Sequence, residues 1–230
     1  MTQQPKPLQH KDISLSDKYE LEEGVAFMSG LQALTRIPIV QRRRDEAAGL
    51  KTAGFISGYR GSPLGGYDAE LTRANKYLED LDIKFHPGLN EDLAATSIWG
   101  TQQVNLMPGG SDYDGVFGIW YGKAPGVDRS IDALRHASAH GTAPDGGVLA
   151  IVGDDHGCKS STLPCQSDHV LASIIIPVLY PSSINEFVEY GLLGIEMSRY
   201  AGCWTALKVT SETVETTGTV DLSKIRRASC

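Results

Sequence analysis

The 230-residue sequence lacks several features that mark whole classes of protein. It has no apolar run near the roughly 20 residues of a membrane-spanning helix, and its polar start, MTQQPKPLQHKD, lacks the apolar stretch of a signal peptide. It also lacks an excess of positive charge, since 21 Lys and Arg against 28 Asp and Glu give a net charge of −7. Phosphate binding needs a basic surface. We therefore expect a cytoplasmic protein with neither a membrane nor a nucleic-acid partner.

Cysteine is scarce as well. The four cysteines form no CxxC pair and have no spacing typical of metal ligands. They read as reduced thiols, and packing is the more common role because reactive cysteines are rare. We expect no metal site among them. They are Cys158, Cys165, Cys203 and Cys230.

What the chain does contain is an alternation of short apolar runs and amphipathic segments. Strands separated by helices of 10 to 15 residues predict βαβ units. The expected fold is therefore α/β and doubly wound, with a mostly parallel sheet covered by helices on both faces. A helix is expected from about 91 to 107, and another where Ser183 and Glu186 have capping-box spacing. The expected strands are 53–59, 83–87, 115–122, 146–155, 174–181 and 203–210.

The region before the first of these strands is predicted to be helical. Apolar residues recur at helical spacing from Val25 to Leu34. Pro38 should then divide the region 21–50 into two helices, because proline removes a helical hydrogen bond. The expected organisation is a leader over 1–20, an α/β domain over 21–220 and the truncated start of a further segment over 221–230.

Unusual residues gather where predicted strands end. In an open parallel sheet, ligands bind outside the carboxyl ends of the strands. The first such loop, GYRGSPLGG, does not give G-x-G-x-x-G, and Pro63 removes an amide that an anion would use. Arg60 and Ser62 are better placed as donors to a substrate carboxylate, although a tight turn with Arg60 in solvent explains them equally well. The loops concerned are 58–66, 87–91, 121–129 and 153–169.

Glu91 is the most informative residue of these loops. It follows a Pro-Gly turn and precedes a run of small residues, Ala94 to Ser97. The helix dipole favours an acid at this position by only ~0.3–1 kcal/mol, and a capping role alone would account for it. The small residues, however, let another body pack closely. A carboxylate at such an interface would be partly desolvated, which suits proton exchange with a heterocycle nitrogen.

Four longer stretches carry a family resemblance: GYRGSPLGGYD, HPGLNEDLAATSIWGTQQ, GIWYGKAPGVDRSIDALRHA and VGDDHGCKSSTLPCQSDH. Through them the chain from Gly54 to about Val214 resembles the N-terminal domain of the long, fused form of indolepyruvate ferredoxin oxidoreductase. That family belongs to the thiamin-diphosphate-dependent 2-oxoacid:acceptor oxidoreductases. The resemblance implies a pyrimidine-binding (PYR) domain in which Glu91 hydrogen-bonds N1′ of the cofactor's aminopyrimidine ring. It further implies cofactor contacts from Gly58, Tyr59, Lys123 and Asp154, and substrate contacts from Arg60, Ser62 and His156.

The motif GDDHG (153–157) departs from the GDG motif that holds Mg²⁺ in thiamin enzymes. The resemblance implies that Mg²⁺ and the [4Fe-4S] clusters belong to other parts of the enzyme, together with the diphosphate-binding domain that shares thiamin diphosphate. No metal is therefore expected here, and the loop more simply shapes a pocket.

The resulting functional hypothesis is that this chain is one part of an enzyme and is inactive when isolated. The whole enzyme would oxidatively decarboxylate aryl pyruvates such as indolepyruvate to acyl-CoA. Its partners would be coenzyme A and ferredoxin, and it would form a dimer of larger chains. A second hypothesis is a non-catalytic assembly module in which Glu91 only caps a helix. A NAD-binding domain ranks third, because the glycine fingerprint is absent.

Overall fold

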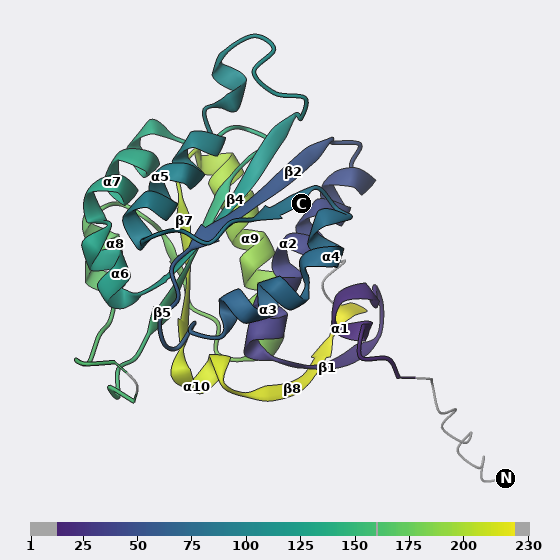
Figure 1. Ribbon diagram of the computed structural model, residues 1–230, viewed down its shortest axis with the longest axis vertical. Coiled ribbons are helices and arrows are strands. Elements are labelled where there is room, and N and C mark those ends of the chain that lie inside the picture. The colour runs from purple at the N-terminus through teal and green to yellow at the C-terminus, as the bar shows by residue number, and fades with distance from the viewer. Residues whose placement is uncertain (1–12, 160, 224–230) are drawn as a thin grey trace, which may run out of the picture.

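The computed structural model describes residues 13–159 and 161–223. Its centre is a six-stranded parallel sheet with the strand order β3-β2-β4-β5-β7-β6, and helices cover both of its faces (Figure 1). The predicted doubly wound α/β fold is thereby confirmed. The strands are β2 (Thr52–Gly58), β3 (Ile83–Phe85), β4 (Gly115–Lys123), β5 (Val148–Asp154), β6 (Val178–Leu179) and β7 (Thr205–Thr210).

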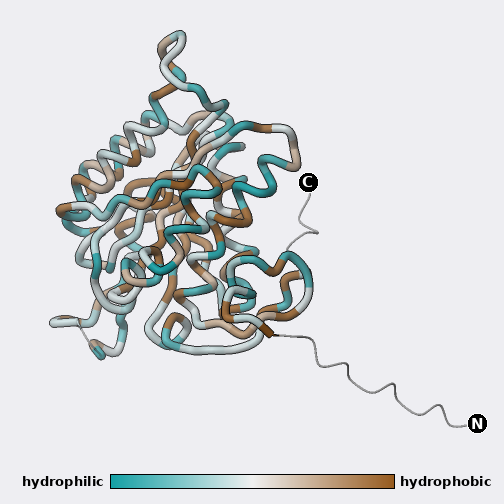
Figure 2. Tube along the Cα trace, turned by 45° about the vertical axis from the view of Figure 1, so that its right-hand side comes forward, coloured by the Kyte–Doolittle hydropathy of each residue, from teal (hydrophilic) through white to brown (hydrophobic). Residues whose placement is uncertain are grey.

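Two apolar clusters fill the space between the sheet and its helices. All residues of β5 and β7 are buried, as expected for central strands covered on both sides. Figure 2 shows the apolar residues concentrated in the centre of the molecule. One face carries α2 (Gly30–Ala47), α3 (Tyr67–Arg73), α4 (Asn75–Glu79) and α9 (Ile184–Ala201). The other carries α5 (Glu91–Thr101), α6 (Ala124–Arg129), α7 (Ile131–His140) and α8 (Asp168–Ser173).

The helix predicted over the start of 21–50 is wrong, because that stretch contains a strand. Strand β1 (Val25–Ser29) pairs antiparallel with β8 (Thr217–Asp221) in a separate two-stranded sheet. Burial alternates along β1, so that Val25 is exposed where the helical pattern made it a core residue. The pairing joins segments far apart in sequence, so local periodicity cannot reveal it.

The predicted break at Pro38 does not occur. Helix α2 runs from Gly30 to Ala47 with Pro38 inside it. Proline leaves the carbonyl four residues earlier without its helical donor. Here that carbonyl belongs to Leu34, and the hydroxyl of Tyr67 donates to it at 3.4 Å. The helix is also buried between the sheet and its neighbours, which favours one continuous element.

Two further local predictions need correction. The strand expected over 174–181 is reduced to β6, because Ile174 ends α8, Ile175 has a positive φ of 61° and Pro177 has no N–H to donate. The capping box of Ser183 is not formed. Glu186 instead accepts hydrogen bonds from the amide and hydroxyl of Ser182, at 2.7 and 2.9 Å.

The ends of the described chain are packed onto the domain. Residues Asp17–Glu20 form α1, and the buried hydroxyl of Tyr19 donates to Glu70. The short elements η1 (Val104–Leu106) and α10 (Ser211–Val214) and the β1–β8 pair complete the described fold. Residues 1–12 and 224–230, including Cys230, lie outside the described residues. Within the described part, no helix has the length and apolar character needed to cross a bilayer.

Candidate functional site

The carboxyl ends of β2, β3 and β4 are joined directly by backbone hydrogen bonds. The amide of Gly88 donates to Gly58 O at 2.8 Å, and the amide of Tyr59 donates to Tyr121 O at 3.1 Å. A side chain at Gly58 would place its Cβ 2.2 Å from Tyr121 O, so the close approach requires glycine. The role of Gly58 that the structure establishes is therefore to let three loops converge at one edge.

Glu91 begins α5 at this edge, but it does not cap the helix. Asn90 is the N-cap, and its side-chain oxygen accepts from the amide of Leu93 at 2.8 Å. The backbone carbonyl of Glu91 accepts from Trp120 Nε1 at 3.0 Å. The backbone around Glu91 is thus fixed by other residues, and its carboxylate is not needed to form the helix.

The Glu91 side chain is 7% exposed and lies against Gly126 of α6. A Cβ at Gly126 would come within 2.6 Å of Glu91 Cγ and 2.8 Å of Oε1, so the carboxylate occupies the space that a larger residue would need. Among the described residues, its oxygens have no hydrogen-bond or ion-pair partner. Neither oxygen is among the fully enclosed atoms without a partner, so the carboxylate keeps some contact with solvent. Partial burial of an unpaired carboxylate is unfavourable. The start of α5 offsets part of this cost through its dipole.

Other residues predicted for the site lie at the same edge. Tyr59 and Arg60 are exposed at the end of β2, and Ser62 is half-buried in the loop that follows. Lys123 ends β4, three residues before Gly126, and its stem covers Gly61, where a Cβ would lie 2.8 Å from Lys123 Cδ. An aromatic ring and two cationic side chains therefore lie on the Glu91 side of the edge.

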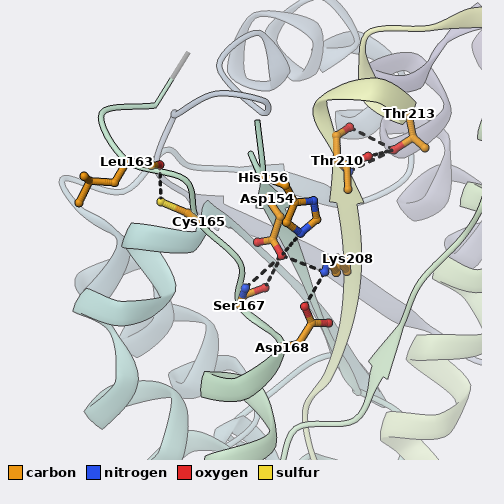
Figure 3. A network of polar contacts seen from close by, with 9 residues as sticks. All are labelled: Asp154, His156, Leu163, Cys165, Ser167, Asp168, Lys208, Thr210 and Thr213. Carbon is orange, nitrogen blue, oxygen red and sulfur yellow. Dashed lines mark hydrogen bonds and ion pairs between the residues drawn. The ribbon is translucent and has the colours of Figure 1, made fainter. Parts of the chain in front are cut away.

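Asp154, at the end of β5, has very different surroundings (Figure 3). It is fully buried, and its Oδ2 accepts from the amide and hydroxyl of Ser167 at 3.0 and 3.2 Å. Lys208 Nζ lies 3.3 Å from the same oxygen. Although Oδ1 has no partner within the part of the chain that the structure describes, the carboxylate is enclosed by protein. The structure therefore gives Asp154 a supporting position behind the loop.

Lys208, from β7, is the residue of this region that the sequence reasoning missed. Its ammonium also contacts Asp168 Oδ2 at 2.5 Å and lies over the ring of Tyr180. Burial opposes the charged form, but the carboxylates of Asp168 and Asp154 outweigh it and raise the pKa of Lys208 above its ordinary value. A lysine inside an apolar strand, TALKVT, is the signal that could have identified it.

The Asp154 region also tests the metal hypothesis. Ligand atoms of Asp154, His156 and Asp168 lie within 4.8 Å of one another. The Lys208 ammonium, however, lies between the two carboxylates and supplies the positive charge that a cation would bring. Lys208 balances one of the two negative charges and uses Oδ2 of both carboxylates, so a metal ion would have to displace it and the donor set does not suit a resident metal ion.

His156 lies in front of Asp154, and its loop is held by the neighbouring Asp155. Nε2 of His156 is 3.9 Å from Asp154 Oδ2, and its side chain is 40% exposed. The two carboxylate oxygens of Asp155 accept from the amides of Lys159 and Ser161, each at 2.9 Å. Asp155 therefore shapes the loop, and His156 provides the side chain of the GDDHG motif that reaches the surface.

A cavity of about 470 Å³ lies at the opposite end of the edge from Glu91, beside the start of α9 and the β8 strand. Serine and threonine hydroxyls dominate its lining. None of the predicted site residues lines it, so we do not assign it to the Glu91 site. Its lining residues are Ser182, Ser183, Ile184, Asn185, Glu212, Thr213, Thr216, Thr217, Gly218 and Thr219.

Comparison with known proteins gives structural relatives but no sequence relatives. No protein-family model and no curated protein sequence matches the chain. Among solved structures, it is similar to a 2-oxoglutarate:ferredoxin oxidoreductase from Magnetococcus marinus, solved with 2-oxoglutarate, coenzyme A and succinyl-CoA bound. The TM-score is 0.64 at 16% identity, over 86% of this chain and 32% of that one. The chain thus shares its fold with about a third of a larger oxidoreductase chain.

Proposed function

We propose that this chain is the PYR part of a thiamin-diphosphate-dependent 2-oxoacid:ferredoxin oxidoreductase that acts on aryl pyruvates such as indolepyruvate. The fold shared with the 2-oxoglutarate:ferredoxin oxidoreductase supports the general class. Because the chain spans only 32% of that protein, the diphosphate-binding part, Mg²⁺, the [4Fe-4S] clusters, and the sites for coenzyme A and ferredoxin would come from further domains or subunits.

The observation that carries the proposal is the environment of the Glu91 carboxylate. It is buried, held against Gly126, and has no partner among the described residues. An acid that only capped a helix would bond to the first amides, and Asn90 already does so. A buried acid without a partner suits a ligand that donates a hydrogen bond, as the protonated ring nitrogen of an aminopyrimidine does.

In the proposed mechanism, the chain positions groups and moves one proton. Glu91 would hold a proton at its carboxylate that it shares with the ring nitrogen of the cofactor, and the cofactor would supply a nucleophilic carbon and an electron sink. Asn90 and Trp120 fix the backbone of Glu91, so its carboxylate needs little reorganisation when a ligand binds. Gly58 and Lys123 line the same edge as proposed cofactor contacts, and Asp154 supports it from behind.

The substrate side of the proposal rests on exposed residues. Arg60 offers a planar guanidinium that can pair with a 2-oxo acid's carboxylate through two hydrogen bonds, and Ser62 adds a hydroxyl. Tyr59, the proposed cofactor contact beside Arg60, also offers an aromatic surface that suits an aryl group. His156, on the neighbouring loop, is a further donor for the substrate.

A second candidate, a non-catalytic assembly module, is favoured by two apolar side chains near Glu91. Leu89 is 85% exposed and Leu93 is 50% exposed, and exposed apolar residues of this size suit a protein interface. Both candidates predict docking of another domain at this edge. They differ in whether the carboxylate of Glu91 is needed for turnover.

The experiment that tests the proposal compares the isolated chain with the complete enzyme that contains it. With thiamin diphosphate, Mg²⁺ and coenzyme A, the complete enzyme should reduce an artificial electron acceptor in the presence of indolepyruvate, and faster than with 2-oxoglutarate. The isolated chain should show no turnover, because half of the cofactor site comes from elsewhere. Turnover by the isolated chain, or a preference for 2-oxoglutarate, would contradict the proposal.

A further inference from the structure

Cys158 and Cys165 are brought together by a single backbone carbonyl. The amide of Cys158 and the amide of Cys165 both donate to Asp155 O, each at 3.2 Å. Asp155 and Cys165 also form an isolated antiparallel bridge. Each Cα is only one bond from its amide nitrogen. The shared acceptor keeps the two cysteines adjacent, and a disulfide spans Cα atoms roughly 4.4–6.8 Å apart.

The two thiols face the same short turn. Cys158 Sγ donates to Ser161 O at 2.6 Å, and Cys165 Sγ donates to Leu163 O at 2.9 Å. Both cysteines are half-buried and both are free thiols. Figure 3 shows Cys165 beside the Asp154 network, on the segment that leads to Ser167. Each thiol thus donates to a carbonyl of the loop that connects the two cysteines.

The conformation of Cys158 contributes to this approach. Its φ is 52°, in the left-handed region that residues other than glycine rarely adopt. The turn is held by Asp155, whose carboxylate accepts from the amides of Lys159 and Ser161. A non-glycine residue persists in this region where its surroundings fix it. Here Asp155 fixes a turn that directs the chain back toward Cys165.

The charges place the two thiols within range of each other, while the raised pKa lowers the thiolate fraction of Cys165. Burial raises the pKa of the Cys165 thiol, and the charges of Asp128 and Cys158 add to the increase. Burial alone raises the pKa of Cys203. Cys165 therefore has a second cysteine within electrostatic range, whereas Cys203 provides an internal comparison without one.

We propose that Cys158 and Cys165 are a redox pair that forms a reversible disulfide when the chain meets a peroxide. One thiolate attacks a peroxide oxygen and becomes a sulfenic acid, releasing water once protonated. The second thiol then attacks that sulfur, the S–S bond forms and a second water leaves. Two thiols and one hydrogen peroxide thus give one disulfide and two waters, and a dithiol reductant reverses the reaction.

The position of the pair gives the reaction a structural consequence. His156 lies two residues before Cys158, and Ser167, which binds Asp154, lies two residues after Cys165. A disulfide would tie both ends of the turn between them. The proposal concerns this chain's own thiols and does not depend on the cofactor or on turnover.

The test uses the full chain with Cys230→Ser, so that only the three described thiols remain. After treatment with hydrogen peroxide, the intact mass should fall by two hydrogens and the thiol count under denaturing conditions should fall from three to one, both reversed by dithiothreitol. Trypsin separates the cysteines into peptides 136–159, 160–199 and 200–208. The oxidised sample should therefore contain the first two peptides joined.

Three variants on this background complete the test. Cys158→Ser and Cys165→Ser should each abolish the joined peptide, whereas Cys203→Ser should leave it unchanged. Three unreacted thiols, a joined peptide containing Cys203, or oxygen addition at Cys158 or Cys165 without a link would each overturn the proposal.

Discussion

Glu91 and Asp154 are two buried carboxylates at the same edge of one sheet, and their surroundings are opposite. Asp154 is bonded to Ser167 and paired with Lys208. Glu91 rests on the backbone of Gly126 and has no partner among the described residues. A paired acid stabilises the fold, whereas an unpaired acid held in place by its neighbours is available to a ligand. We therefore propose the first as a structural group and the second as the functional one.

Removing the carboxylate charge of Glu91 should have the largest effect, on activity and not on folding. In the complete enzyme, Glu91→Gln should lower turnover about 10²–10⁴-fold, the usual contribution of a positioned proton-transfer group. Asp92→Asn is the matched control, because it removes an acid from the same helical turn. Steady-state rates and thermal unfolding of both variants check this. Equal rates for Glu91→Gln and Asp92→Asn would contradict a special role of the Glu91 carboxylate in turnover.

Removing Lys208 should show the reverse pattern, with a large loss of stability. Lys208→Met leaves Asp154 buried without its counter-charge, and such a loss typically costs about 3–5 kcal/mol. The exposed Lys159, which pairs with Glu215 at the surface, is the control, and Lys159→Met should leave the free energy of unfolding unchanged. Urea unfolding measures both. The double variant Asp154→Asn with Lys208→Met should recover part of the loss, which a packing defect would not.

A side chain at Gly126 should affect the Glu91 site through sterics. In Gly126→Ala the new Cβ would meet Glu91 Cγ at 2.6 Å, so the carboxylate must move. We expect about 1–3 kcal/mol of destabilisation together with reduced turnover. Gly100→Ala is the control on α5, since nothing lies within 4 Å of its new Cβ; it should stabilise the chain by roughly 0.5–1 kcal/mol. Unchanged turnover in Gly126→Ala would show that the position of Glu91 is unimportant.

The smallest expected effect is on the pH dependence of stability, and it concerns the region of Asp154 and Lys208. The pKa of Lys208 is raised in the folded chain, so its contribution is complete below the unfolded value of about 10.4. It is lost as the pH rises from there through the folded value. The difference in unfolding free energy between the parent chain and Lys208→Met should therefore stay constant from pH 7 to 9 and shrink above pH 10.4. A difference that shrank already at neutral pH would contradict the charged pair.

Features that depend on local interactions could be predicted from the sequence, whereas features that depend on contacts between distant residues could not. The buried strands and the loops at their carboxyl ends are local patterns, so the fold class and the positions of Tyr59, Glu91 and Lys123 at one edge followed from them. The β1–β8 pairing joins Val25 to Asp221 and leaves no local trace. Likewise, the hydroxyl that accommodates Pro38 comes from Tyr67, on another helix.

The same limit applies within the site. The sequence places Asp154 beside His156, but the partner that makes Asp154 structural is Lys208, more than fifty residues away. The glycine that receives Glu91 is 35 positions along the chain from it. Residue types at a strand end can therefore predict that a site is present. Whether a given acid there is paired or free depends on contacts that only the folded chain defines.

The central claim, that the unpaired carboxylate of Glu91 acts on the cofactor, is tested most directly by proton exchange. The measurement is the rate of hydrogen–deuterium exchange at C2 of the thiazolium ring of thiamin diphosphate bound to the complete enzyme, followed by NMR after acid quench. The account predicts slow exchange in Glu91→Gln and parental exchange in Asp92→Asn, with the cofactor bound in both. Parental exchange in Glu91→Gln would contradict the account and leave Glu91 a structural residue of the interface.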